Sequence, residues 1–160
     1  MHPFLRHSLA ELVVPEAQVL VPGYAVWDWR VDHADLYALT TWGLPRIERP
    51  HFFPDPLPEA SPHRYREFEC YRLGTAMATP IGVIAGAGTV IAEEQAGPAL
   101  VNTTLERYVE SAWRYYWLVE ELGGTMNDET FDVLDAFLAR LQAIDPGIGS
   151  SHWAAVVEGW

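Results

Sequence analysis

The spacing of apolar residues changes along this chain of 160 residues, and that change limits the folds open to it. Between residues 67 and 101, apolar side chains either alternate with polar ones or form short runs, which is typical of β-strands. From residue 103 onward they recur every three or four positions, as in amphipathic helices. Strands followed by helices predict an α+β fold, in which a mainly antiparallel or mixed sheet is flanked by helices and the last third is helical.

A glycine-containing turn marks the centre of the predicted sheet. The apolar segments 81–85 and 89–93 flank Gly86-Ala87-Gly88, an arrangement that suits a hairpin. The alternation over 67–72 predicts a strand before this hairpin, and residues 99–101 predict a short one after it. The turn lacks the third glycine of a dinucleotide fingerprint and no evident helix follows it, so a phosphate-binding loop is not predicted.

The C-terminal third carries the start and stop signals of two longer helices. Thr103, with Glu106 three residues later, forms a capping box, and Gly123-Gly124 stops the first helix. The second helix is predicted to begin near Asn127 and to end at 145–147.

The second helix has two different faces. Its predicted apolar stripe consists of Phe131, Leu134, Leu138, Leu141 and Ile144. Its opposite face carries Asp128, Asp132 and Asp135. A final short helix is predicted over 151–158, with Trp153, Val156, Val157 and also Trp160 as its inward-facing residues.

The first third of the chain gives weaker signals. Over residues 1–31, apolar clusters interrupted by prolines predict a short helix followed by a strand or extended segment. A clearer helix is predicted over 32–42, with Asp32 as its cap, Asp35 near the positive end of its dipole, and a stop at Gly43. The five prolines between residues 46 and 62 predict an irregular surface loop.

The composition bounds the class of protein. Hydrophobic residues make up 49% of the chain and charged residues 20%, which is enough apolar surface for one core, so residues 1–160 are predicted to form a single domain. The apolar runs are far shorter than the about 20 residues that span a bilayer, and the first residues lack the apolar stretch of a signal peptide. We therefore expect a cytoplasmic protein.

The charge of the chain is strongly one-sided. Its formal net charge is −12, and all ten of its cationic residues are arginine, with no lysine. Such a field repels a nucleic-acid backbone or an anionic membrane and attracts a basic protein. The charge therefore favours a basic protein as partner and argues against nucleic-acid and membrane partners.

No combination of residues predicts a catalytic or metal site. Cys70 is the only cysteine and lies in a predicted strand, where a buried structural role is far more common than a nucleophilic one. The histidines show no metal-binding spacing, and Asp32-His33-Ala34-Asp35 is interpreted as a helix start. We expect no metal, no cofactor and no enzymatic activity. The alternative is a small hydrolase or ligand-binding enzyme whose site is assembled from Cys70, the histidines or the three aspartates of the second helix.

Five residues are candidates for contact with a partner. Glu93 and Glu94 end a predicted strand, where they would form an exposed acidic rim. Trp27 and Trp29 share one face of a predicted extended segment, so they belong either to the core or, if exposed, to a contact patch. Asp55 lies in the proline-rich loop.

Six short segments, taken in their order along the chain, carry a resemblance to a known family. They are residues 41–45 (Thr-Trp-Gly-Leu-Pro), 52–53 (Phe-Phe), 71–74 (Tyr-Arg-Leu-Gly), 100–105 (Leu-Val-Asn-Thr-Thr-Leu), 145–146 (Asp-Pro) and 152–153 (His-Trp). In this order, and with the glycine-bearing hairpin between the third and fourth, they resemble the SUKH superfamily of bacterial immunity proteins, in particular its fourth group. The hairpin departs from the family pattern, because residues 80–85 are apolar where a more polar, acidic strand is usual.

The resemblance implies both a fold and a task. The fold is an α+β domain without a cofactor. The task is to bind and neutralise a cognate polymorphic toxin, often a nuclease or a nucleic-acid deaminase, by direct protein–protein interaction.

Overall fold

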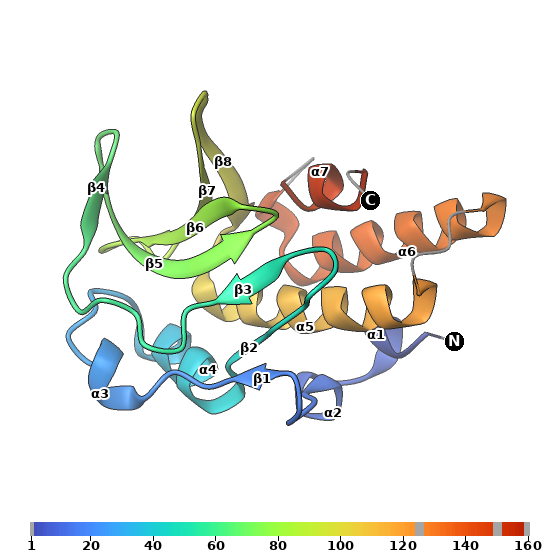
Figure 1. Ribbon diagram of the computed structural model, residues 1–160, viewed down its shortest axis with the longest axis horizontal. Coiled ribbons are helices and arrows are strands. Elements are labelled where there is room, and N and C mark those ends of the chain that lie inside the picture. The colour runs from blue at the N-terminus through green and yellow to red at the C-terminus, as the bar shows by residue number, and fades with distance from the viewer. Residues whose placement is uncertain (1, 124–126, 149–151, 159–160) are drawn as a thin grey trace.

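The computed structural model of the chain describes residues 2–123, 127–148 and 152–158. Its N-terminal part contains three one-turn helices, a two-residue strand and one longer helix (Figure 1). In chain order these are α1 (Pro3–Arg6), α2 (Leu9–Leu12), β1 (Gln18–Val19), α3 (Gly23–Val26) and α4 (His33–Trp42). The extended segment predicted around Trp27 is wrong, because α3 begins after Pro22 and Trp27 keeps a helical conformation. A single turn is too short to show helical periodicity in the sequence.

Helix α4 ends as predicted, but its acidic residues act differently from the prediction. Gly43 has φ +63°, and a Cβ there would lie 2.3 Å from the Val19 carbonyl oxygen. Asp32 occupies the N-cap position without a side-chain hydrogen bond to the helix. Asp35 is buried instead, and its Oδ1 accepts a hydrogen bond of 2.9 Å from the backbone N–H of Glu106. Asp35 therefore accepts a hydrogen bond from the first turn of another helix, the one that contains Glu106.

Within the described residues, seven strands follow α4, and their pairings are antiparallel. They are β2 (Leu44–Pro45), β3 (Phe52–Pro54), β4 (His63–Tyr65), β5 (Phe68–Ala76), β6 (Thr79–Ile84), β7 (Val90–Glu94) and β8 (Gly97–Asn102). Strand β2 pairs with β1, and the other six form one sheet in the order β3-β5-β6-β7-β8, with β4 also paired to β5. The hairpin predicted around Gly86-Ala87-Gly88 is confirmed as β6–β7. The prediction of an irregular loop over 46–62 misses β3, which pairs with the distant end of β5.

The sheet has an inner face toward the helices and an outer face. Cross-strand partners share a face, and the register pairs Tyr71 with Val83 and Val83 with Val90, all of them buried on the inner side. Arg72 pairs with Gly82, which places these two on the outer face. By the alternation along each strand, Cys70 of β5 and Glu93 of β7 also belong to the outer face.

The C-terminal part is helical, as predicted. Its elements are α5 (Leu105–Leu122), α6 (Asp128–Ile144), the 3-10 helix η1 (Pro146–Ile148) and α7 (His152–Glu158). Helix α5 ends at Gly123 and α6 begins at the N-cap Asn127, as predicted, but Thr104 rather than Thr103 caps α5. Phe131 is 58% exposed, so its place in the predicted apolar stripe is wrong. Residue 151, the predicted start of the last helix, and Trp160, predicted to face inward, lie outside the described residues.

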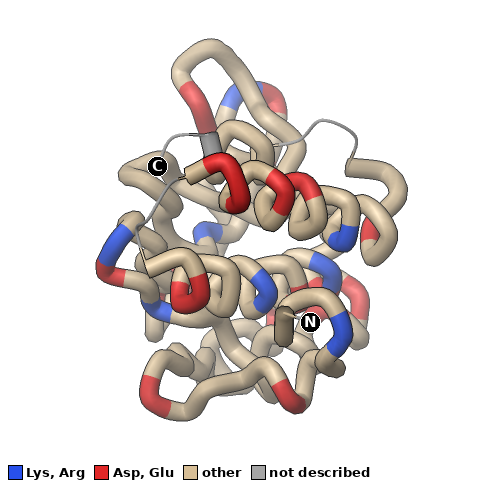
Figure 2. The backbone as a smooth tube through the Cα atoms, turned by 90° about the vertical axis from the view of Figure 1, so that its right-hand side faces the viewer, with Lys and Arg blue, Asp and Glu red and all other residues tan. Residues whose placement is uncertain are grey.

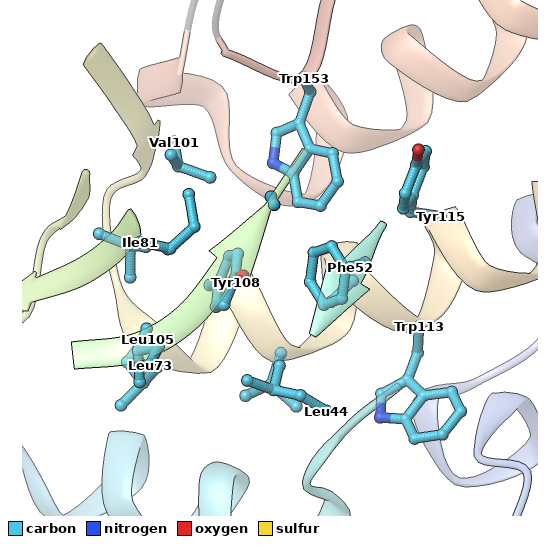
Figure 3. Packing of buried hydrophobic residues seen from close by; sticks show 14 of the residues in the cluster. Leu44, Phe52, Leu73, Ile81, Val101, Leu105, Tyr108, Trp113, Tyr115 and Trp153 are labelled. Carbon is cyan, nitrogen blue, oxygen red and sulfur yellow. The ribbon is translucent and has the colours of Figure 1, made fainter. Parts of the chain in front are cut away.

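Aromatic rings from three elements form the centre of the core (Figure 3). Phe52 of β3 lies 6.3 Å from Tyr108 and 6.1 Å from Tyr115 of α5, measured between ring centroids. Trp153 of α7 lies 5.4 Å from Tyr115. The indole N–H of Trp113, also on α5, donates to the Gly43 carbonyl oxygen (3.1 Å). Helix α5 is therefore the element on which the sheet, α4 and α7 meet.

A buried polar network joins the end of β8 to the C-terminal elements. Both oxygens of Asp145 accept hydrogen bonds from Thr103, one from its backbone N–H (2.8 Å) and one from its hydroxyl (2.6 Å). Asn102 donates to the same carboxylate and to Ser111, and it accepts from the indole N–H of Trp153 (2.9 Å). Buried polar groups need such partners. The segments 100–105, 145–146 and 152–153 of the family resemblance thus meet in one structural network.

Candidate functional site

The outer face of the sheet encloses a hollow of about 670 Å³. In Figure 1 the ends of the β4–β5 and β7–β8 ribbons project from the sheet on the side away from α5. Side chains of the first ribbon bridge to the second: the Tyr65 hydroxyl donates to the Glu94 carbonyl oxygen (2.5 Å), and the Arg66 guanidinium donates to the Gln95 carbonyl oxygen. These hydrogen bonds connect the two ribbons and keep the sheet curved. The charged or titratable residues lining the hollow are Asp55, Glu59, His63, Arg72 and Glu93.

Glu93 lies deepest among the acidic residues of the hollow. Its side chain is 6% exposed, and its Oε1 lies 2.5 Å from His63 Nε2. Because an ionised carboxylate only accepts hydrogen bonds, His63 is the donor. The other oxygen, Oε2, has no hydrogen-bond partner within the described part of the chain. A Cβ at Gly82 would lie 3.1 Å from this oxygen, so the glycine leaves the room that the carboxylate occupies.

The wall of the hollow is the segment between β3 and β4. The Asp55 backbone N–H donates to the Leu73 carbonyl oxygen (2.9 Å), and the Trp29 indole N–H donates to the Glu59 carbonyl oxygen (3.2 Å). Asp55 Oδ2 also lies 3.7 Å from Arg72 Nε, in an ion pair whose side chains are half-exposed. Such a pair is worth little energetically, so the backbone contacts and Trp29 carry most of the positioning of this wall.

Trp27 and Trp29 lie in different environments, so they do not share a face as predicted. Trp27 is 74% exposed at the end of α3. Trp29 is buried and stacks on Tyr71, with 4.5 Å between ring centroids. A turn that follows α3 separates them: the Trp29 backbone N–H donates to the Val26 carbonyl oxygen, whereas two alternate residues of a strand would share a side. Trp29 therefore supports the hollow from within the core.

Two of the three predicted acidic candidates, Asp55 and Glu93, line the hollow. Glu94 follows Glu93 in the strand and so belongs to the opposite face of the sheet, where its 45% exposed side chain lies near His152 of α7. Sequence reasoning missed His63 and Arg72. Arg72 falls on the same side of the predicted strand as Phe68 and Cys70, so the alternation gave no signal for it. The place of His63 depends on the β4–β5 register opposite Cys70.

Cys70 lies on the same face but does not form a nucleophilic site. The thiol is fully buried, and this burial, with a smaller contribution from the Glu93 charge, raises the pKa of Cys70 to about 11. A thiolate is the reactive form, so this thiol stays protonated and inert near neutral pH. Within the described residues, no group of three or more His, Cys, Asp or Glu side chains could hold a metal ion.

The remaining residues of the enzyme hypothesis lie elsewhere. Asp128, Asp132 and Asp135 are exposed on α6, which packs against α5 and α1 rather than against the outer face of the sheet (Figure 1). His152 is buried, with its side chain 8% exposed, and its Nδ1 lies 3.9 Å from Glu94 Oε1. Burial lowers the pKa of His152, an effect that the charge of Glu94 partly opposes. These groups converge on no common point where acid and base could act together.

Acidic residues are distributed over many elements. On the side seen in Figure 2, Asp and Glu positions occur from the top of the molecule to the bottom and do not gather in one patch. The net charge therefore creates a general negative field, and the hollow is distinguished by its shape and its buried carboxylate. In the described ranges, no helix combines the length and the apolar character needed to cross a membrane.

The fold and the site define a class of protein: an α+β chain with a curled antiparallel sheet, a helical C-terminal part and a polar hollow that lacks a nucleophile–base pair among the described residues. The family model that matches is that of the SUKH-4 immunity protein, and the match covers residues 4–159. The chain belongs to this family. Comparisons with curated proteins and with solved structures gave no significant match.

Proposed function

We propose that the chain is an immunity protein that binds a cognate polymorphic toxin directly and thereby neutralises it. The observation that carries the proposal is the family match, which covers nearly the whole chain. The toxin of this proposal is a nuclease or a nucleic-acid deaminase with a basic surface. Because such toxins act on nucleic acid inside the cell, the same proposal places this protein in the cytoplasm.

The charge of the chain supports a basic partner. A net charge of −12 accelerates encounter with a positively charged protein and disfavours binding to nucleic acid itself. A toxin that binds nucleic acid needs a basic surface to neutralise phosphates. An acidic protein that covers this surface would exclude the substrate without any chemistry of its own.

The site supports binding in preference to catalysis. Cys70 is protonated near neutral pH, and the imidazole of His63 donates to Glu93. Neither residue has the arrangement of an activated nucleophile beside its base. We therefore propose that the hollow contributes to recognition.

The proposal is tested by co-expression. The toxin domain encoded beside this protein is produced in a sensitive host with and without it, and the two proteins are then purified together. We expect survival only in the presence of this protein and a stoichiometric complex of the two chains. Cell death at equal toxin levels, with no complex recovered, would contradict the proposal for that pair.

A further inference from the structure

We propose that the hollow on the outer face of the sheet receives a basic side chain of the toxin, whose cationic group pairs with the Glu93 carboxylate. This inference rests on the proposed function, and it names the residue of this chain and the chemical group of the partner that meet. It concerns one defined position and is separate from the general attraction between the acidic chain and a basic protein.

The strongest support is the incomplete hydrogen bonding of Glu93. Its side chain is 94% buried, and only Oε1 has a partner, His63. Oε2 has none within the described residues. A buried carboxylate oxygen without a donor is costly, and a site that keeps one is prepared for a donor from outside. A guanidinium or ammonium N–H supplies this donor and the compensating charge at once.

The charge of the lining favours a cation. The hollow is lined by three carboxylates, on Asp55, Glu59 and Glu93, and by one guanidinium, on Arg72. Arg72 is already paired with Asp55. Even with a protonated His63, the carboxylates remain in excess. An anionic ligand would meet repulsion here, whereas a basic side chain would complete the charge balance.

The shape of the hollow suits a long basic side chain. A volume of about 670 Å³ is ample for one such side chain and the backbone beside it. Part of the lining is apolar, from Leu57, Pro58 and Pro80, and can contact the aliphatic stem of an arginine or lysine. Leu57 is 61% exposed and is therefore available for this contact. A side chain at position 82 would crowd the carboxylate, because a Cβ there would lie 3.1 Å from Glu93 Oε2, and the glycine avoids this.

The first test uses the isolated protein and three small probes. Nα-acetyl-L-arginine amide, Nα-acetyl-L-lysine amide and the neutral isostere Nα-acetyl-L-citrulline amide are titrated into ¹⁵N-labelled protein, and amide shifts are followed by NMR. We expect saturable shifts at His63, Gly82 and Glu93 with a cationic probe, with a dissociation constant on the order of 1 mM for a ligand of this size. The arginine and lysine probes show which cation fits better. Equal shifts with citrulline, or no saturation with either cation, would overturn the inference.

The second test uses Glu93→Gln, which keeps the shape of the side chain and removes its charge. The matched control is Glu120→Gln, on the exposed surface of α5. We expect Glu93→Gln to weaken both the cationic probe and the toxin by about tenfold or more, because a hydrogen bond to a charged group is lost. The control should bind both like the wild type.

The two proposals fail in different ways. If wild type and both variants bind the toxin equally, the Glu93 inference is wrong while the immunity function stands. If wild type binds the cationic probe but no toxin, the function is wrong for that toxin and the cation site remains. Because the comparison of arginine with citrulline needs no variant, the inference can be refuted even if Glu93→Gln does not fold.

Discussion

Asp145 is a fully buried carboxylate whose role is structural. It accepts four hydrogen bonds, two from Thr103, one from Asn102 and one from Arg107, and thereby ties the end of α6 to the junction of β8 and α5. Glu93 is the contrasting case, because one of its oxygens has no partner in the described part of the chain. Complete bonding is typical of a structural carboxylate, and incomplete bonding of one that meets a ligand.

Replacing Asp145 should strongly destabilise the fold. Asp145→Ala removes the acceptor of four buried or part-buried hydrogen bonds, and we expect the free energy of unfolding to fall by about 3 kcal/mol. Urea denaturation followed by tryptophan fluorescence measures the change. The control Asp135→Ala, on the exposed face of α6, should change it by less than about 0.5 kcal/mol. Equal effects of the two substitutions would refute the structural role.

His152 should make stability depend on pH. Burial lowers its folded-state pKa below the ordinary value of 6.5, so the unfolded chain takes up a proton more readily than the folded one. The contribution of His152 is therefore complete above pH 6.5 and is lost as the pH falls through the lowered folded-state pKa. Urea denaturation at a series of pH values from about 8 to 5 should show this loss in the wild type and a weaker one in His152→Leu. If the free energy of unfolding changed with pH in the same way in both proteins, His152 would not be the group responsible.

At the scale of elements, α5 depends on a cap that comes from another helix. Two backbone N–H groups in the first turn of α5 find acceptors outside the helix. The Thr104 side chain accepts from the Arg107 N–H (3.2 Å), and Asp35 of α4 accepts from the Glu106 N–H. Desolvation raises the pKa of Asp35, with the hydrogen bond from Glu106 opposing this shift. The position near the positive end of the α5 dipole favours the carboxylate.

The two aspartates of α4 should therefore differ in importance. Asp35→Ala removes a buried charge-assisted hydrogen bond, and we expect a loss of about 2 kcal/mol in the free energy of unfolding. Asp32→Ala removes an N-cap residue without a side-chain bond and should cost less than about 0.5 kcal/mol. Thermal denaturation of both variants measures the difference. A larger loss for Asp32→Ala would restore the role that the sequence pattern predicts for it.

Elements with strong local signals were predictable from the sequence, and elements set by distant contacts were not. The starts and stops of α4 and α6 and the β6–β7 hairpin follow from residues adjacent in the chain. Strands β3 and β4 have three residues each and exist through pairing with β5, which no local pattern encodes. The site shows the same division: Glu93 and Asp55 were predicted as candidates, but their meeting with His63 in one hollow depends on that pairing.

At the scale of the whole molecule, residues from both ends of the chain belong to one core. The hydrophobic cluster extends in sequence from Phe4 to Val157, and Arg114 of α5 is buried and donates to the carbonyl oxygens of Phe4 and His7 (2.7 and 3.0 Å). We propose from this that the chain folds as a single domain. The hollow on the outer face of the sheet lies on the side away from this core.

A single domain should unfold in one cooperative step. Tryptophan fluorescence, to which the buried Trp29, Trp113 and Trp153 contribute, and far-ultraviolet circular dichroism should give coincident urea transitions. This agreement is expected because sheet and helices share the aromatic residues of α5. Two separated transitions would contradict the single-domain proposal.

We propose that this protein neutralises a toxin by forming a direct complex with it. The most direct measurement mixes the purified protein with the purified toxin domain, determines the mass of the product by size-exclusion chromatography with light scattering, and assays the toxin in the same samples. We expect a complex of one chain of each protein and loss of toxin activity at equimolar ratio. Full toxin activity in the presence of excess protein, with two separate peaks, would contradict it.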